Sequence, residues 1–171
     1  MSKIILVTGG ARSGKSAIAE NLIAALGAGP IYIATAEARD EEMADRIAKH
    51  QARRGPEWTT HNEPLDLIGA LKATDGHGPR LVDCLTLWLS NMMLQDADWE
   101  SASHNLVSAL PAQQSPIVFV TNEVGGGIVP DNQLARAFRD AAGLLNQWVA
   151  AAADDAYLAV AGLPLQLKPG R

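Results

Sequence analysis

Short runs of consecutive apolar residues recur along the chain, and longer stretches with apolar positions at a helical period separate them. Within five runs the apolar residues are successive rather than alternate, which is typical of strands covered on both faces, as in a parallel sheet. These runs are 4–8 (IILVT), 31–35 (IYIAT), 81–84 (LVDC), 117–121 (IVFVT) and 157–161 (YLAVA). A further segment, 165–168 (LQLK), is a candidate edge strand.

The stretches between these runs predict helices at about 16–27, 40–54, 64–74, 86–110 and 132–152. Strands that alternate with helices predict a doubly wound α/β fold. The segment 74–80 (TDGHGPR) contains glycine and proline, and we interpret it as a surface loop rather than a domain boundary. A length of 171 residues suits one well-cored domain. We therefore expect a single domain over residues 1–171.

Composition and charge exclude several classes of partner. The net charge is −5, so the surface as a whole repels nucleic acid and anionic membranes. The only cysteine, Cys84, cannot form an internal disulfide, which suits a reducing cytosol. The apolar run at 4–7 is too short for the core of a signal peptide, and no run reaches the length of a membrane span. We expect a cytoplasmic protein with no nucleic-acid partner.

A phosphate-binding loop is the clearest motif. GGARSGKS follows the first predicted strand directly, leads into the first predicted helix and fits G-x-x-x-x-G-K-[ST]. Its backbone amides and the helix N-terminus would surround phosphate oxygens, with Lys15 on the β and γ phosphates and Ser16 on Mg²⁺. The alternative, a glycine-rich turn with a surface lysine, does not explain this context. The predicted nucleotide contacts here are Gly9, Gly10, Ala11, Arg12, Ser13, Gly14, Lys15 and Ser16.

Together with the alternation of strands and helices, this loop predicts a P-loop NTPase-like fold, with a mostly parallel sheet and helices on both faces. An acid should then face the loop from another strand end. Asp83 follows two apolar residues of the third predicted strand, and its carboxylate could bind Mg²⁺ directly or through water. The alternative is an acid at a sheet edge or an N-cap for the helix that begins near Thr86.

One histidine lies among basic residues in DRIAKHQARRG, residues 45–55. Helical spacing puts Arg46 at i−4, Arg53 at i+3 and Arg54 at i+4 from His50. Three cations disfavour protonation of an imidazole, and the neutral ring can attack an electrophile. The same arginines could hold the phosphates of a nucleotide. On this segment alone, a solvated basic helix end with an incidental histidine is the favoured interpretation.

Several segments together resemble one family, the bifunctional adenosylcobinamide kinase / adenosylcobinamide-phosphate guanylyltransferase of cobalamin biosynthesis. They reach from near the N-terminus to about residue 155, and the second and fourth are far more specific than the phosphate loop. The segments are ILVTGGARSGKS, YIATAEARDEEMADRIAKHQARR, LVDC and TNEVGGGIVPDNQLARAFRDAAGLLNQWVAAAAD.

The resemblance implies two reactions. The first moves the γ-phosphoryl group of ATP or GTP to the hydroxyl of the aminopropanol arm of adenosylcobinamide. The second transfers GMP from GTP to adenosylcobinamide phosphate, which releases pyrophosphate and forms adenosylcobinamide-GDP. In the family a histidine on the second helix becomes covalently guanylylated, and it aligns with His50. With this resemblance we favour the covalent role for His50. The phosphate loop implies Mg²⁺ as cofactor, and the resemblance also implies a homo-oligomer.

Further nucleotide contacts come from the resemblance alone. Relatives often have two acids after a W-x-T element, where this chain has WTTHNEP, so an amide replaces the first acid. Asn62 is then the equivalent contact, although a shift of one residue would choose Glu63. Asp83 stands where some relatives have glutamate. The contacts implied in this way are Ala34, Thr35, Ala36, Gln51, Ala52, Arg53, Arg54, Asn62 and Asp83.

Some alternatives stay open at this point. Glu123, in the loop after the fourth strand, could contact metal or could position the corrinoid or the nucleotide. The three other histidines and the four tryptophans have no clustered spacing, and we interpret them as surface or packing residues. Rival functions are a P-loop kinase of another small metabolite without a covalent intermediate, a nucleotide switch or ATPase subunit, and a family member that keeps only guanylyl transfer.

Overall fold

The computed structural model describes residues 2–38 and 41–169, apart from the side chains of residues 42 and 46. One seven-stranded sheet has the strand order β3-β2-β4-β5-β1-β6-β7. Its first six strands in this order are parallel, and β7 is antiparallel to β6. The strands are β1 (Ile4–Gly9), β2 (Ile31–Ala34), β3 (Thr59–Asn62), β4 (Arg80–Asp83), β5 (Ile117–Asn122), β6 (Asp155–Val160) and β7 (Leu163–Lys168).

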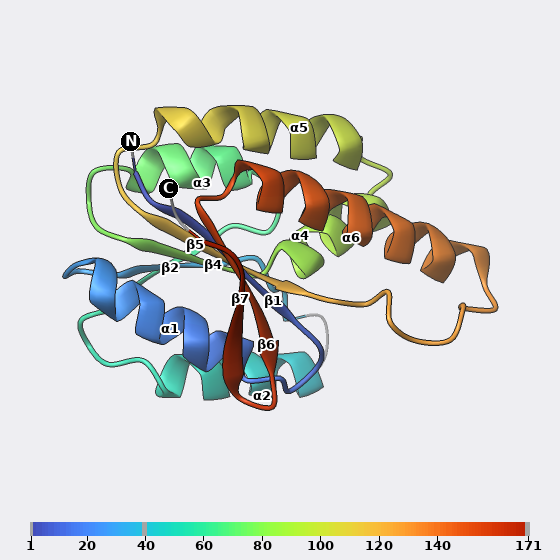
Figure 1. Cartoon of the computed structure of the whole chain (residues 1–171), viewed down its shortest axis with the longest axis horizontal. Helices are drawn as coiled ribbons and strands as arrows, with labels where there is room; N and C mark the ends of the chain where they lie inside the picture. Colours follow the sequence, from blue (N-terminus) through green and yellow to red (C-terminus); the bar gives the residue numbers. More distant parts are fainter. Residues whose placement is uncertain (1, 39–40, 170–171) are drawn as a thin grey trace.

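Helices cover both faces of this sheet. In Figure 1, α1 and α2 lie on one face, and α3 to α6 lie on the other. The helices are α1 (Lys15–Leu26), α2 (Glu41–Ala52), α3 (Leu67–Thr74), α4 (Leu85–Leu94), α5 (Trp99–Ala109) and α6 (Gln133–Ala152), with a 3₁₀ turn at Leu110–Ala112.

Successive strand residues supply two separate hydrophobic cores. Ile4 and Leu6 of β1 pack with the helices of one face, whereas Ile5 and Val7 pack with Ile18 and other residues on the α1 side. Because both faces are buried, successive residues of β1 from Ile4 to Val7 are apolar. The predicted doubly wound sheet, its five central strands and the edge strand at the C-terminal end are thus confirmed.

The structure corrects two predicted elements. The strand β3 was not predicted, because its residues TTHN are polar and mostly exposed at the edge of the sheet. The single helix predicted at 86–110 is wrong: the chain forms two helices, α4 and α5. Asp96 adopts a positive φ of 51° between them, and the Asp98 side chain accepts a hydrogen bond from the Ser101 amide at the start of α5. The positive φ at Asp96 ends α4, and the Asp98 side chain caps the beginning of α5.

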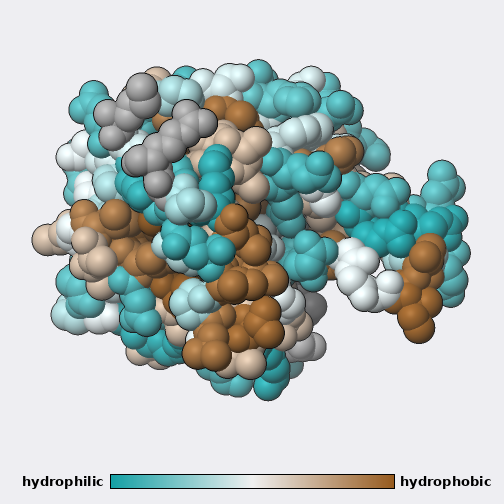
Figure 2. Space-filling model, in the orientation of Figure 1, coloured by the Kyte–Doolittle hydropathy of each residue, from teal (hydrophilic) through white to brown (hydrophobic). Residues whose placement is uncertain are grey.

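The antiparallel hairpin of β6 and β7 leaves apolar side chains on the surface. Leu163, Leu165 and Leu167 alternate along β7 and are each more than half exposed. Figure 2 shows a hydrophobic patch over this hairpin. Ala161 and Gly162 connect the two strands, and both have positive φ, as a tight hairpin turn requires.

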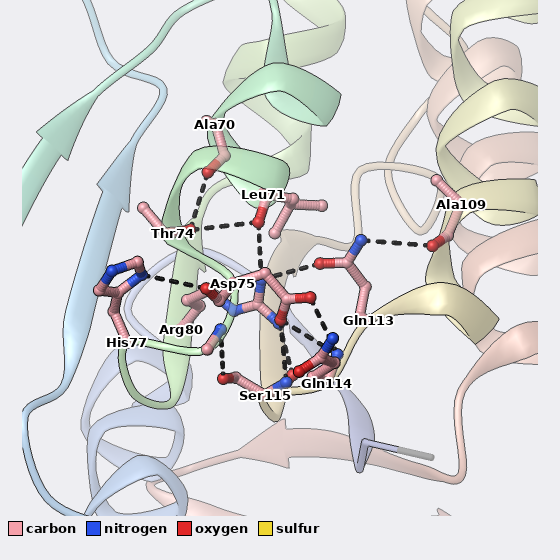
Figure 3. A network of polar contacts seen from close by, with 11 residues as sticks. Ala70, Leu71, Thr74, Asp75, His77, Arg80, Ala109, Gln113, Gln114 and Ser115 are labelled. Carbon is pink, nitrogen blue, oxygen red and sulfur yellow. Dashed lines mark hydrogen bonds and ion pairs between the residues drawn. The ribbon is translucent and has the colours of Figure 1, made fainter.

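A buried arginine fixes the end of the sheet at which β4 and β5 begin (Figure 3). Arg80 is fully buried and donates hydrogen bonds to the Leu71 carbonyl and the Gln113 side chain, each at 2.8 Å. It also pairs with Asp75 at 3.1 Å. Burial raises the pKa of the Asp75 carboxyl, but hydrogen bonds from the Ser115 and Gln114 amides and the charge of Arg80 outweigh this, so the pKa is lowered.

We expect Arg80→Met to lower the free energy of unfolding by about 3–5 kcal/mol, because it leaves the buried Leu71 and Ser115 carbonyls without their donor and breaks the ion pair with the partly buried Asp75. Urea unfolding followed by circular dichroism measures this loss. Arg139→Met is the matched control, since among the described residues Arg139 pairs only with its neighbour Asp140 on α6, and this variant should lose less than about 0.5 kcal/mol. Equal losses in the two variants would contradict a structural role for the Arg80 network.

Candidate functional site

The phosphate loop connects the end of β1 to α1 and is held by the β6–β7 hairpin. Gly14, the residue before α1, has a φ of 92°, and a Cβ atom there would lie 2.8 Å from the Cα of Gly162. The Gly162 amide donates a 2.8 Å hydrogen bond to the Ser13 carbonyl. Gly14 is therefore required for its backbone conformation and for the close contact with the hairpin. No side chain of the described residues caps the start of α1, so its first amides can face an anion.

A cavity of about 820 Å³ opens beside this loop, at the carboxyl ends of the parallel strands. Open α/β sheets bind ligands at this edge. Side chains from the loop, from β2 and β4, and from α2 line the cavity. Of the predicted site residues, it brings together Arg12, Ser13, Gly14, Lys15, Ser16, Ala34, Ala36, His50, Gln51, Arg53, Arg54, Asn62 and Asp83.

Five predicted contacts lie outside the residues that line this cavity: Gly9, Gly10, Ala11, Thr35 and Ala52. Thr35 is fully buried, and its hydroxyl bonds to the Cys84 carbonyl at 2.7 Å and accepts the Cys84 amide at 2.8 Å. It therefore joins the ends of β2 and β4 beneath the cavity. Gly10 reaches the site through its backbone, because its carbonyl accepts a 3.0 Å hydrogen bond from Lys15 Nζ.

A tyrosine links two of the predicted contacts. The Tyr32 hydroxyl donates a 3.0 Å hydrogen bond to Asp83 Oδ2, and the guanidinium carbon of Arg54 lies 3.4 Å from the Tyr32 ring centroid. Burial, and then the Asp83 carboxylate, raise the pKa of Tyr32, so its hydroxyl remains a donor. Within the sequence Tyr32 looked only like one apolar residue of a strand. The only signal in the sequence was its position two residues before the predicted contact Ala34, which places both side chains on the same face of the strand.

His50 lies on the face of α2 that lines the cavity, together with Met43 and Ile47. Its Nδ1 atom is buried and has no hydrogen-bond partner among the described residues. Two of the three arginines expected near His50, Arg53 and Arg54, follow the end of α2 at Ala52 and line the same cavity. Arg53 pairs with Glu20 of α1 at 3.3 Å, and Arg54 stacks on Tyr32. The side chain of Arg46 lies outside the described residues.

The polar groups of the cavity fit a magnesium ion bound together with phosphates. Among the described residues, no group of three or more His, Cys, Asp or Glu side chains could hold a metal. Mg²⁺ at nucleotide sites needs fewer protein ligands, usually one or two carboxylates besides substrate phosphates. Tyr32 occupies one Asp83 oxygen, which leaves Oδ1, and the Ser16 hydroxyl lines the same cavity. The N-cap of α4 is Cys84 rather than Asp83, so the N-cap alternative for Asp83 is wrong.

Other polar residues have identifiable local roles. Burial, and then the adjacent Asp83, raise the pKa of Cys84 to about 12, so its thiol is not a nucleophile at neutral pH. The Glu123 carboxylate accepts the Gly125 amide at 2.7 Å within its own exposed loop. The neighbouring Asn122 lines the cavity, which the sequence did not predict.

The tryptophans pack as predicted. Trp88 is buried, and Trp99 stacks on Trp148 with ring centroids 6.1 Å apart. His104 lies against the same Trp148 ring, which supports its structural role. In the described part of the chain, no helix has both the length and the apolar character that a membrane crossing requires.

Comparison with known proteins adds independent findings. A family model described as cobinamide kinase / cobinamide phosphate guanyltransferase matches residues 5–167. The chain is 45% identical over 166 residues to a bifunctional adenosylcobalamin biosynthesis protein, CobP, of Pseudomonas aeruginosa, and the match covers 95% of this chain and 96% of that protein. It is 42% identical to the CobU protein of Salmonella typhimurium, which bears the same description, with 96% of this chain and 99% of that protein covered.

A solved structure shares the fold. An ATPase of a bacterial type III secretion system superposes with a TM-score of 0.59 at 12% sequence identity. The match covers 96% of this chain but only 56% of the ATPase chain. At this identity the likeness concerns the fold alone, and it agrees with the P-loop NTPase-like architecture predicted from the strand–loop–helix motif.

Proposed function

The chain belongs to the cobinamide kinase / cobinamide phosphate guanyltransferase family, and from that premise we propose that it guanylylates adenosylcobinamide phosphate through a covalent GMP–His50 intermediate. We further propose that it first forms this substrate by phosphorylating adenosylcobinamide with ATP or GTP. The observation that carries the proposal is the position of His50, which lines the same cavity as the phosphate loop and has a buried ring nitrogen without a partner in the described structure.

In the kinase reaction, the acceptor hydroxyl oxygen attacks the γ-phosphorus of the nucleotide. The bond from this phosphorus to the β–γ bridging oxygen breaks, the hydroxyl proton leaves, and a nucleoside diphosphate is released. The backbone amides of the phosphate loop and Lys15 would hold the β and γ phosphates in line for this attack. Asp83 and Ser16 would hold Mg²⁺, which neutralises charge on the phosphates.

In the guanylyl transfer, a neutral imidazole nitrogen of His50 attacks the α-phosphorus of GTP. The bond to the α–β bridging oxygen breaks, pyrophosphate leaves, and the other ring nitrogen releases its proton. A phosphate oxygen of adenosylcobinamide phosphate then attacks the same phosphorus, and the N–P bond breaks as the imidazole regains a proton. Two displacements thus replace one difficult transfer. Arg54 has a buried Nη1 without a hydrogen-bond partner among the described residues, and this group would donate to a phosphate oxygen during these steps.

We also propose a single domain over residues 1–171, a cytoplasmic location and a homo-oligomer. The lone, buried Cys84 supports a reducing compartment. The exposed leucines of β7 support a contact with another copy, because exposed apolar patches on an edge strand are commonly covered in assemblies.

Incubation with labelled GTP tests the covalent intermediate. The protein is denatured after incubation with Mg²⁺ and GTP labelled at either the α or the γ position. We expect protein-bound label only from α-labelled GTP, and expect it to be lost in acid and kept in base, as a phosphoramidate is. If a folded, GTP-binding protein acquires no α-label, the covalent mechanism is wrong. The site would then function as a plain P-loop kinase.

A further inference from the structure

Three side chains from separate segments form a continuous line along the wall of the cavity. Asp83 ends β4, Tyr32 lies within β2, and Arg54 follows the last turn of α2. The Tyr32 hydroxyl bonds to Asp83 at 3.0 Å, and the Tyr32 ring lies 3.4 Å beneath the guanidinium carbon of Arg54. Trp58 supports the ring edge-on at a centroid distance of 6.5 Å. Tyr32 is only 7% exposed, so this arrangement is well fixed.

We infer that Tyr32 is a positioning residue that sets the metal-binding Asp83 and the phosphate-binding Arg54 at the correct places for one nucleotide. This inference rests on the proposed function. Tyr32 belongs neither to the phosphate-loop motif nor to the proposed nucleophile. Its two interactions are chemically separate, because the hydroxyl acts on the carboxylate and the ring face acts on the cation.

The hydroxyl controls the direction of the carboxylate. Its hydrogen bond occupies Oδ2 of Asp83, so Oδ1 would be the oxygen that holds Mg²⁺. Without this bond the carboxylate can rotate about its terminal torsion, which has a broad energy profile. The consequence should be weaker binding of Mg²⁺, while the charge of Asp83 remains.

The ring face controls the direction of the guanidinium. Stacking uses the flat face of Arg54 and leaves its in-plane N–H groups for ligands. One of these groups, Nη1, is buried without a hydrogen-bond partner in the described part of the chain. The ring also lies between a cation and an anion that no direct ion pair joins in the described structure. A smaller side chain would let Arg54 and Asp83 attract each other and withdraw both from the nucleotide.

Two substitutions separate these interactions. Tyr32→Phe removes the hydroxyl and keeps the ring, whereas Tyr32→Leu removes both. Tyr157→Phe is the matched control, because Tyr157 lies on β6, and its hydroxyl bonds to Gln166 of the hairpin rather than to a cavity residue. Calorimetry would measure GTP affinity in chelator and then at increasing Mg²⁺ concentrations. Thermal unfolding of each variant would establish that it is folded.

For Tyr32→Phe we expect the affinity for GTP without metal to stay within about twofold of wild type. Mg²⁺ raises the affinity for GTP, and we expect the Mg²⁺ concentration that produces half of this rise to be roughly tenfold higher in the variant. For Tyr32→Leu we expect the same metal effect and also a five- to tenfold loss, roughly, of metal-free affinity. Tyr157→Phe should match wild type in both measurements.

Two outcomes would overturn the inference. If Tyr32→Phe has the Mg²⁺ dependence of wild type, the hydroxyl does not position Asp83. If both variants lose metal-free and metal-dependent affinity to the same extent, Tyr32 has a merely structural role. A failure of the proposed function looks different, because wild type itself would then fail to bind GTP or to acquire α-label.

Discussion

Replacing His50 with alanine is expected to lower guanylyl transfer at least about a thousandfold, because the variant lacks the atom that forms the covalent bond. The same variant should keep kinase activity within about tenfold of wild type, since the acceptor hydroxyl attacks the γ-phosphorus directly in that reaction. The loss would be in kcat rather than in GTP affinity, because the phosphate loop and Lys15 are unchanged. One substitution should therefore separate the two activities.

The measurement compares adenosylcobinamide-GDP formation from adenosylcobinamide phosphate with phosphorylation of adenosylcobinamide in the same preparation. His77→Ala is the control, because His77 is exposed and its ring contacts the Asp75 carbonyl at the opposite edge of the sheet. If His50→Ala transfers GMP at the wild-type rate, the acceptor phosphate attacks GTP directly and His50 is not the nucleophile. A family member that only guanylylates would instead have no kinase activity even in wild type.

Lys15→Ala is expected to lower both reactions, each by roughly a thousandfold. In the structure the Lys15 ammonium lies 3.0 Å from the Gly10 carbonyl, which places it on the phosphate loop at the edge of the cavity. In the kinase reaction it would stabilise the transferred phosphoryl group and the leaving diphosphate. In guanylyl transfer it would stabilise the leaving pyrophosphate. Its charge acts on the same part of GTP in both cases.

Single-turnover rates of both reactions at saturating GTP measure this effect. Lys72→Ala is the matched control, because Lys72 is exposed on α3, which packs on the face of the sheet opposite α1, and both rates should remain within about twofold of wild type. A variant that loses only the kinase reaction would indicate separate nucleotide sites for the two reactions. That result would contradict the assignment of a single cavity.

The sequence predicted the fold where the physical signal was local and strong. Central strands buried on both faces contain runs of successive apolar residues, such as residues 4–7 in β1 and 117–120 in β5, so both strands could be recognised directly. The edge strand β3 contributes mostly exposed polar side chains and is defined by its backbone pairing with β2, which leaves no apolar signal. The break between α4 and α5 depends on the backbone of one residue, Asp96.

The candidate site also contains residues that the sequence predicted and residues that it did not. The phosphate loop could be predicted because its glycines, Lys15 and Ser16 are contiguous, and Asp83 because it follows a buried strand. Tyr32 and Asn122 enter the cavity only through the order of strands in the sheet, which a linear pattern does not reveal. The guanidinium groups of Arg53 and Arg54 could not be placed from helical spacing. Both residues follow the end of α2, and their partners Glu20 and Tyr32 come from other elements.

The hydrogen bond from Gly162 to Ser13 has a consequence for synthesis on the ribosome. The phosphate loop emerges long before the turn that supports it and the strand β6 that pairs with β1. A nascent chain can therefore expose the complete nucleotide-binding motif while its supporting contacts are still unmade. Nucleotide binding should begin only once the C-terminal hairpin has joined the sheet, so the onset of GTP affinity would report the completion of folding.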